Sequence, residues 1–367
     1  MLLLPIIFAC ASTEPEASLP DGADPGTRPA GARADAAAPP ARRIGELPPA
    51  LQVDGAPILL PGLCEPSGAA RAVDGGILIV DDDLDGNVFA WSPGTPPVRQ
   101  SFPAVDVKDA EGLAVDDEGG LWVSGGLGRS RHKGKVGKRG AVARYVGGPE
   151  WTLDLATVEL RPGRQPDALA PLMAAIHAAC PECRLPSDAS GMEEGHAFDV
   201  EGLGWAGAGR LLFGLRAPLV AERAIVFAAD PAALRARAPL TDVVTAAWAL
   251  DLGGRGVRDL GPGTDGAMLL LVGAHSNRET PGGALYRWRP GTAVEPLGTM
   301  PRLGAPAEAI VADGPRAAWL FLDEGKRLAE GLRPRGPHAA KDENGRLELR
   351  CGAGRPTDWA HAVHVSW

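Results

Sequence analysis

Five short segments of this chain share one arrangement of polar and apolar residues. In each, an acidic or turn-forming residue precedes a brief apolar stretch, and a Gly/Asp turn leads to a second apolar stretch that ends in polar residues. The acids at these positions could bind a metal ion: Glu65, Asp81, Asp82, Glu111, Glu201, Asp259 and Glu308. Carboxylates that share a site repel one another unless protons, arginines or a cation offset the charge. Oxygen-rich sites suit Ca²⁺, so one interpretation is a calcium site. The alternative is that each glutamate accepts backbone N–H bonds from a neighbouring unit and joins the units.

Basic residues form a second chemical group. Between residues 129 and 144 the chain carries many basic residues and no acid, although its net charge is −9. Lys and Arg side chains attract phosphate and carboxylate groups, and Arg binds them with two hydrogen bonds. We therefore expect an anionic small molecule or polymer as the ligand, with a solvated loop as the alternative for the lysines. The expected ligand-binding residues are Arg129, Arg131, Lys133, Arg139, Arg216, Arg255, Arg258 and His275.

The repeat itself predicts the fold that would position these groups. Repeats of roughly 40–50 residues built from short strands are typical of an all-β propeller. We expect five blades, with six if Trp359–Trp367 joins a further sheet. Blade five is expected to use Leu347–Cys351 as a strand, and residues 51–60 are expected to supply a missing strand and close the ring. Hairpin geometry then brings the repeated polar positions to one rim.

The rest of the chain predicts an export signal, a tether and two insertions. Residues 1–10 resemble the end of an export signal with a lipobox, in which Cys10 would be lipidated. Residues 11–49 have the composition of a disordered tether. The propeller would occupy 50–367, with insertions at 161–197, containing a helical lid over 167–180, and at 326–345. We expect an exported monomer, lipid-anchored to a bacterial envelope on its periplasmic side or at the cell surface.

Four further cysteines favour disulfides in an exported protein. Cys180 and Cys183 could pair with each other, and a bond between Cys64 and Cys351 would reinforce ring closure. The rival interpretation of Cys180 and Cys183 is a redox pair or half of a metal site. The net charge of −9 argues against a general nucleic-acid binder. Membrane contact is expected through the lipid anchor only, and the sequence contains no common hydrolase or nucleotide-binding motif.

Several motifs in order resemble one bacterial family. They include Asp109-Ala-Glu-Gly112, Val200-Glu-Gly-Leu203, Gly214-Leu-Arg-Ala-Pro218, Leu285-Tyr-Arg-Trp288 and the basic run from Arg129 to Arg139. Together, over residues 62–325, they resemble the family numbered 3616 among domains of unknown function. The sequence departs from that pattern at Ser124-Gly-Gly126 and at Leu322-Asp-Glu-Gly325. The resemblance implies a propeller-like domain and no established reaction. A looser similarity to the esterase-like phytase propellers is an analogy of fold.

Two functions follow from these patterns. The first is a tethered, non-catalytic propeller that binds an anionic ligand at its rim, supported by the basic run and by the missing catalytic motif. The second is a calcium-dependent, phytase-like phosphoesterase, supported by both charge signs on one rim.

Overall fold

The computed structural model describes residues 48–63, 65–82, 84, 86–102, 107, 110–128, 140–148, 150–160, 166–190, 197–207, 209–275, 282–303, 305–323, 339–341, 347–349 and 360–367. Residues Leu47–Trp367 form one compact unit.

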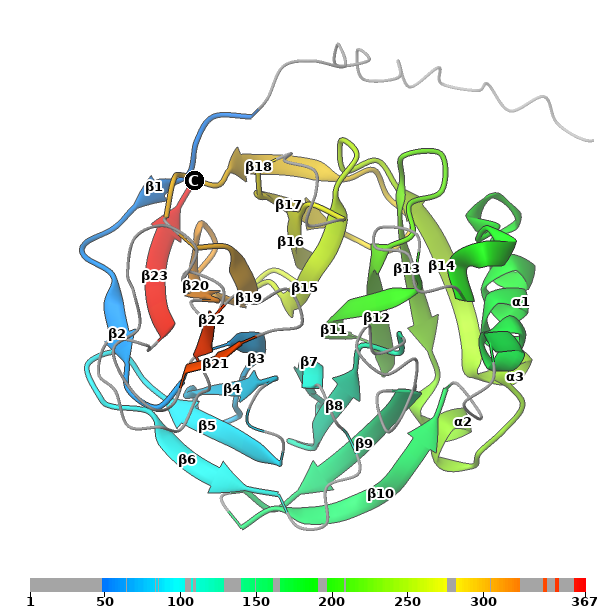
Figure 1. Cartoon of the computed structure of the whole chain (residues 1–367), viewed down its shortest axis with the longest axis horizontal. Helices are drawn as coiled ribbons and strands as arrows, with labels where there is room; N and C mark the ends of the chain where they lie inside the picture. Colours follow the sequence, from blue (N-terminus) through cyan, green and yellow to red (C-terminus); the bar gives the residue numbers. More distant parts are fainter. Residues whose placement is uncertain are drawn as a thin grey trace, which may run out of the picture. The chain divides into compact units, whose positions relative to one another are not determined.

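Five antiparallel sheets form the blades of a β-propeller, as Figure 1 shows. The sequence prediction of five blades is confirmed. Blade one contains β3 (Pro66–Arg71), β4 (Ile77–Asp81), β5 (Asn87–Trp91) and β6 (Val98–Ser101). Blade two contains β7 (Ala110–Val115), β8 (Leu121–Gly125), β9 (Ala141–Val146) and β10 (Thr152–Glu159). Blade three contains β11 (Asp199–Ala206), β12 (Arg210–Ala217), β13 (Ala224–Ala229) and β14 (Val244–Leu250). Blade four contains β15 (Gly256–Pro262), β16 (Met268–Gly273), β17 (Ala284–Trp288) and β18 (Glu295–Thr299).

Both ends of the chain build blade five. Its inner strands are β19 (Ala307–Ala312), β20 (Ala317–Leu322) and β23 (Ala360–Ser366), and β1 (Gln52–Val53) and β2 (Ile58–Leu60) pair with the outer side of β23. The segment predicted to close the ring therefore does so. The six-blade alternative does not occur, because Ala360–Ser366 joins blade five rather than a further sheet. The expected use of Leu347–Cys351 in blade five was wrong, because β22 (Leu347–Leu349) pairs with β21 (Ala339–Lys341).

The innermost strands of neighbouring blades pack tightly because small residues lie where they approach. A Cβ atom added to Gly68 of β3 would lie 2.9 Å from the backbone nitrogen of Leu113 in β7. One added to Gly112 of β7 would lie 2.5 Å from the Cβ of Leu203 in β11. Real side chains cannot occupy these spaces, so glycine permits the strands to meet at the hub. Positions on the inner strands are consequently close to one another across blades.

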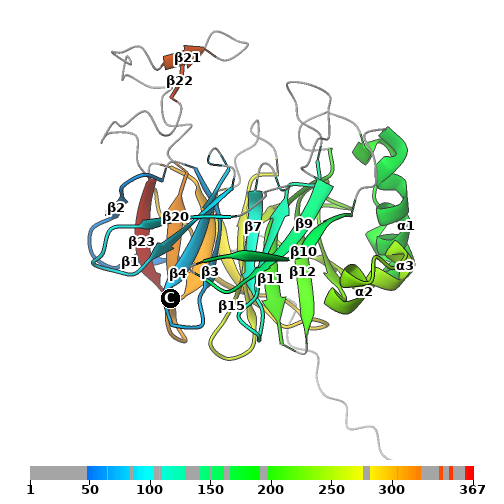
Figure 2. The ribbon, with the colours of Figure 1, turned by 90° about the horizontal axis from the view of Figure 1, so that it is seen from below.

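Helical segments lie outside blade three rather than over the ring. The helix α1 (Ala170–Ala179) follows a short 3₁₀ turn, and α2 (Pro231–Arg235) and α3 (Leu240–Val243) lie between β13 and β14. Leu172 and Ile176 of α1 are buried, and the helix contacts β14 and α3 (Figures 1 and 2). A helix was predicted here, but its assignment as a lid was wrong because its apolar face covers the outermost strand.

The predicted bond between Cys180 and Cys183 is present directly after α1. Cys10, Cys64 and Cys351 lie outside the described residues, as does most of the predicted loop 326–345. No helix in the described part of the chain is long and apolar enough to cross a bilayer.

Candidate functional site

The five innermost strands share a β-bulge at the same position near their first residues. In every blade, the pairing of the first strand with the second skips one residue: Ser67, Glu111, Glu201, Arg258 and Glu308. A bulge turns its extra residue out of the regular alternation and re-aims its side chain. These five residues are therefore equivalent and face one mouth of the ring. The sequence predicts that Glu65 and Asp259 are equivalent to the glutamates Glu111, Glu201 and Glu308. The strand register instead places Ser67 and Arg258 at the equivalent bulge positions.

The bulge residues of blades three, four and five are joined in an ion-pair chain. Arg258 Nη1 donates to Glu201 Oε2 at 3.0 Å and to Glu308 at 2.9 Å (Oε1) and 2.8 Å (Oε2). Its Nη2 donates to the carbonyl oxygen of Ala274 at 3.1 Å. Arg258 is only 9% exposed, and both glutamates are buried. Burial acts to lower the pKa of Arg258, but Glu201 and Glu308 outweigh it, and the pKa lies above its usual range.

A second arginine approaches the same glutamate from blade three. Arg216 lies at the mouth end of β12, and its Nη1 donates to Glu201 Oε1 at 2.6 Å. The carboxylate of Asp199 lies 3.8 Å from the same nitrogen. Burial acts to lower the pKa of Arg216, but Glu201, Asp199 and Glu308 outweigh it and raise the pKa above the ordinary value. Glu201 thus holds two guanidinium groups from adjacent blades, each in its charged form.

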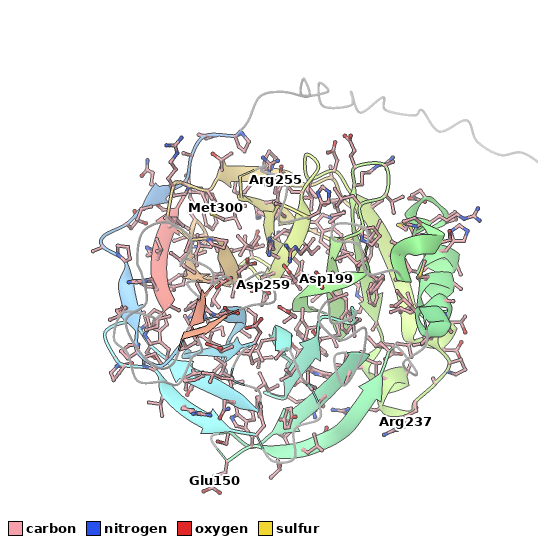
Figure 3. The ribbon with its side chains drawn as sticks, in the orientation of Figure 1. Glu150, Asp199, Arg237, Arg255, Asp259 and Met300 are labelled. Atoms are coloured by element: carbon pink, nitrogen blue, oxygen red, sulfur yellow. A yellow bond between two sulfur atoms is a disulfide. The ribbon has the colours of Figure 1, made fainter. Side chains whose placement is uncertain are left out.

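Asp259 lies at the hub beneath this chain, near the centre of the ring in Figure 3. It is 0% exposed, and its two oxygens accept the N–H groups of Leu260 and Ile310, each at 2.8 Å. The N–H group of Ala69 also binds it. Burial raises the pKa of Asp259 well above the usual range, although these amide donors oppose the shift. The residue joins the inner strands of blades four, five and one.

Carboxylates dominate the other side of the mouth. Asp81 and Asp323 are buried at the mouth ends of the second strands of blades one and five, and Asp82 follows Asp81. Asp81 Oδ2 accepts the N–H group of Glu65 at 3.1 Å. Glu111 is the bulge residue of blade two and is partly exposed. Among the described residues, the arginines of the mouth therefore lie over blades three and four, and these four carboxylates lie over blades one, two and five.

Blade two adds a strained segment to the mouth. Leu127 is buried and has a φ of +54°, a conformation that non-glycine residues rarely adopt. The segment lies against blade three, because the N–H group of Val200 donates to the carbonyl oxygen of Gly126 at 2.8 Å. Nearby, the Oγ atom of Ser124 is buried without a hydrogen-bond partner among the described residues. Such strain is concentrated at functional sites in proteins.

The remaining predicted ligands are placed apart or lie outside the described residues. Arg255 donates to the carbonyl oxygens of Leu252, Gly253 and Gly282 rather than to the ion-pair chain. His275 is half-buried and follows Ala274, whose carbonyl binds Arg258. Four predicted basic ligands lie outside the described residues: Arg129, Arg131, Lys133 and Arg139.

The described residues contain no preformed cluster of calcium ligands. Among the described residues, no group of three or more His, Cys, Asp and Glu side chains is placed to hold a metal ion. Backbone amides already bind both oxygens of Asp259, and Arg258 binds the carboxylates of Glu201 and Glu308.

Two site residues were missed by sequence reasoning. Asp199 stands two residues before Glu201, and alternation along a strand puts positions two apart on the same face. That signal was present and could have identified it. Ser124 gave no such signal, since its position depends on the register of β7 with β8.

One family profile and several solved structures are similar to this chain. The sequence profile of a family described as "Protein of unknown function (DUF3616)" matches residues 179–302, which confirms the family resemblance over that stretch. No curated protein matches the chain.

Solved structures with a similar fold come from several bacteria. An oxidoreductase described as a glucose dehydrogenase from Thermus thermophilus is 16% identical, with 85% of this chain and 99% of that chain covered and a TM-score of 0.40. A gluconolactonase from Xanthomonas campestris is 12% identical, with 89% and 99% covered and a TM-score of 0.40. A PQQ-bound aldose sugar dehydrogenase from Streptomyces coelicolor is 12% identical, with 87% and 100% covered and a TM-score of 0.38. Similarities of this size do not bear on the chemistry of the mouth.

Proposed function

We propose that the mouth of this propeller binds a small ligand bearing a phosphate or carboxylate group. The observation that supports the proposal is the convergence of Arg216 and Arg258, from adjacent blades, on the two oxygens of Glu201. Arginine binds such anions with paired hydrogen bonds, and holding two guanidinium groups in advance lowers the entropy lost on binding.

The proposed function is therefore binding of a small molecule with a phosphate or carboxylate group, and it requires no reaction.

Titration calorimetry with inorganic phosphate and with acetate tests this proposal. We expect weak, salt-sensitive binding of at least one of these anions by the wild-type protein. Arg216→Lys keeps the charge but loses the paired hydrogen bonds, and should weaken binding by about tenfold. Arg258→Lys should have a similar effect.

Arg144 provides a matched control. It is equally buried and binds three carboxylates, Asp116 at 2.6 Å, Glu118 at 2.7 Å and Asp154 at 2.6 Å. Asp116 follows β7 at the face opposite the mouth, so Arg144→Lys should lower the melting temperature without changing anion affinity. Equal losses of affinity in Arg144→Lys and Arg216→Lys would contradict the proposal, as would the absence of any anion binding.

A calcium-dependent phosphoesterase is the second candidate, because carboxylates and arginines from several blades share the mouth. Calcium bound by carboxylates of the mouth would polarise a phosphate held near the arginines. Melting temperatures measured with Ca²⁺ and with EDTA test this candidate, together with turnover of p-nitrophenyl phosphate. The phosphoesterase candidate would be contradicted if the melting temperature is the same with Ca²⁺ and with EDTA and no p-nitrophenyl phosphate is hydrolysed.

We also propose export and lipid anchoring through Cys10, on the basis of the apolar run before it and the polar segment after it. The disulfide between Cys180 and Cys183 supports an oxidising compartment. In a bacterial host, the wild-type protein should fractionate with membranes and carry the mass of an acylated N-terminus, whereas Cys10→Ala should not. Identical fractionation and mass in both would contradict anchoring.

A further inference from the structure

A pocket of about 510 Å³ lies between blades one and two, away from the mouth. It is lined by residues from the turn that joins β3 to β4, the turn that joins β5 to β6 and the turn that precedes β10. These turns lie at the opposite end of the strands from the bulges. The six residues of β3 separate the two faces by roughly 20 Å at the usual rise of a strand. The pocket is therefore distinct from the candidate site, and its volume is typical of small-molecule sites.

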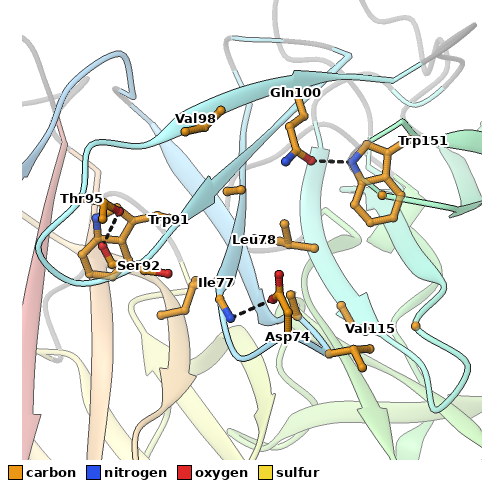
Figure 4. Close-up of a pocket in the computed structure, with 16 residues that line it drawn as sticks. Asp74, Ile77, Leu78, Trp91, Ser92, Thr95, Val98, Gln100, Val115 and Trp151 are labelled. Carbon is orange, nitrogen blue, oxygen red and sulfur yellow. Dashed lines mark hydrogen bonds between the residues drawn. The ribbon is translucent and has the colours of Figure 1, made fainter.

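Aromatic and aliphatic side chains form its walls. Figure 4 shows Trp91 at one end and Trp151 at the other, with Ile77, Leu78 and Val115 between them. At its edge lie Val73, which is 79% exposed, and Val98, which is 59% exposed. These two are the most exposed large hydrophobic side chains in the described residues. Such apolar exposure around a hollow indicates a surface that is covered in use.

Polar groups point into the same hollow and are held in place by the protein. The indole N–H of Trp151 donates to Gln100 Oε1 at 2.8 Å. Because an indole can only donate, this bond fixes the amide so that Gln100 presents its NH₂ donors to the pocket. Asp74 lies between Leu78 and Val115 in Figure 4, and its Oδ1 accepts the N–H of Gly76 at 3.0 Å.

Hydroxyl groups in the turn between β5 and β6 complete the polar set. Thr95 Oγ1 donates to the carbonyl oxygen of Ser92 at 2.8 Å, which leaves its lone pairs as acceptors. The pocket therefore offers a fixed donor at Gln100, acceptors at Asp74 and Thr95, and the adaptable hydroxyl of Ser92. A complementary ligand must both donate and accept hydrogen bonds around an apolar body.

The charges of the pocket further limit the chemical class of ligand that it can bind. None of the described residues that line it is Lys or Arg, so an anion would find no cationic partner among them. A purely apolar ligand would bury the NH₂ group of Gln100 and the second oxygen of Asp74 without offering either a hydrogen bond, which is unfavourable. A sugar ring has hydroxyls that donate and accept and a C–H face that packs on an aromatic ring. We propose that this pocket between blades one and two binds a neutral pyranose.

Titration calorimetry of the full chain with methyl glycosides of glucose, galactose, mannose and N-acetylglucosamine tests the proposal. At least one glycoside should bind. Asp74→Ala should weaken binding by about tenfold, because it removes an acceptor for the sugar hydroxyls. Gln100→Leu should do the same. Asp74→Asn retains a carbonyl oxygen and should lose much less affinity than Asp74→Ala.

Asp265 offers a matched control in blade four. It occupies the turn between β15 and β16, and its Oδ1 accepts the N–H of Ala267 at 3.1 Å, the same local contact as in Asp74. Asp265→Ala should leave glycoside binding unchanged. Arg216→Lys should also leave it unchanged, since that residue lies at the mouth.

Three results would overturn the proposal. The first is that none of the four glycosides binds. The second is that Asp74→Ala and Gln100→Leu bind as tightly as the wild-type protein. The third is that tetramethylammonium binds while the glycosides do not, and that Asp74→Asn abolishes this binding, because the pocket would then recognise an organic cation.

Discussion

Replacing Arg258 by Met should show how much the ion pairs of this arginine contribute to the stability of the protein. Methionine retains an unbranched apolar stem but removes the guanidinium group that lies 2.8 Å from Glu308 and 3.0 Å from Glu201. Glu201 keeps Arg216 at 2.6 Å, whereas both oxygens of Glu308 lose their hydrogen bonds from Arg258. Removing one partner of a buried ion pair typically destabilises a protein by about 3–5 kcal/mol.

Protonation sets an upper limit on this loss. Glu308 can take up a proton instead of remaining charged, which near neutral pH costs about 3.7 kcal/mol for a glutamate of ordinary pKa, about 4.3. We therefore expect Arg258→Met to lower the free energy of unfolding by about 3–4 kcal/mol near neutral pH. Because the folded variant then binds a proton that the unfolded chain lacks, its deficit should shrink by about 1.4 kcal/mol for each unit of pH below neutrality.

Urea unfolding of the full chain at a series of pH values measures both effects. The double variant Arg258→Met/Glu308→Gln should be more stable than Arg258→Met alone near neutral pH, because the carboxylate that lost the Arg258 hydrogen bonds is replaced by a neutral amide. The reasoning would be refuted by a loss below about 1 kcal/mol. It would also be refuted by a deficit that does not change with pH, or by a double variant no more stable than the single one.

Three other predictions concern buried groups. Asp259→Asn should lower the free energy of unfolding by about 2–3 kcal/mol, because the NH₂ group of the asparagine would face a backbone N–H donor. Urea unfolding measures this change, and a loss below about 0.5 kcal/mol would contradict the prediction. Burial acts to raise the pKa of Asp116, but hydrogen bonds from Arg144 and Trp122 outweigh it and lower the pKa below its ordinary value of 3.8. The stability that Asp116 contributes is therefore present above pH 3.8 and is lost as the pH falls through the lower pKa of the folded protein. The advantage of the wild-type protein over Asp116→Asn should accordingly be constant near neutral pH and shrink in strong acid, and an unchanged gap in urea midpoints would argue against it. Burial raises the pKa of Tyr145 to about 12 and also raises that of Tyr286, so stability from these neutral phenols is lost as the pH rises above about 10, the value in unfolded chains. At that pH the folded protein should show less tyrosinate absorbance than the unfolded chain, in which both tyrosines are about half ionised.

The sequence predicted the architecture because each blade repeats a visible pattern of turns and apolar strands. Glu111, Glu201 and Glu308 were aligned correctly, since each stands before a small residue at the start of an inner strand. Ser67 and Arg258 were misaligned because similarity of charge was used as the guide. Their equivalence comes from a bulge, which is a property of the pairing of two strands and leaves no fixed residue type.

Other details depended on choices that only packing decides. Leu347–Leu349 and Ala360–Ser366 both have strand-like sequences, and the second forms blade five because it pairs with β20 on one side and with β1 and β2 on the other. The spacing in α1 predicted a helix but not the surface that it covers. The pocket between blades one and two could not be predicted, since its walls come from turns in two blades that the sequence does not link.

The shared construction of blade five has a consequence for synthesis of the protein. Residues Gln52–Val53 are made early, but their partner strand Ala360–Ser366 is made after the strands of the four other blades. During translation the first four sheets can form while the edge of blade one and the apolar face of blade four still lack their neighbour. The nascent chain therefore exposes apolar surface until that strand is made, so its solubility in that interval depends on chaperones or on rapid completion of blade five.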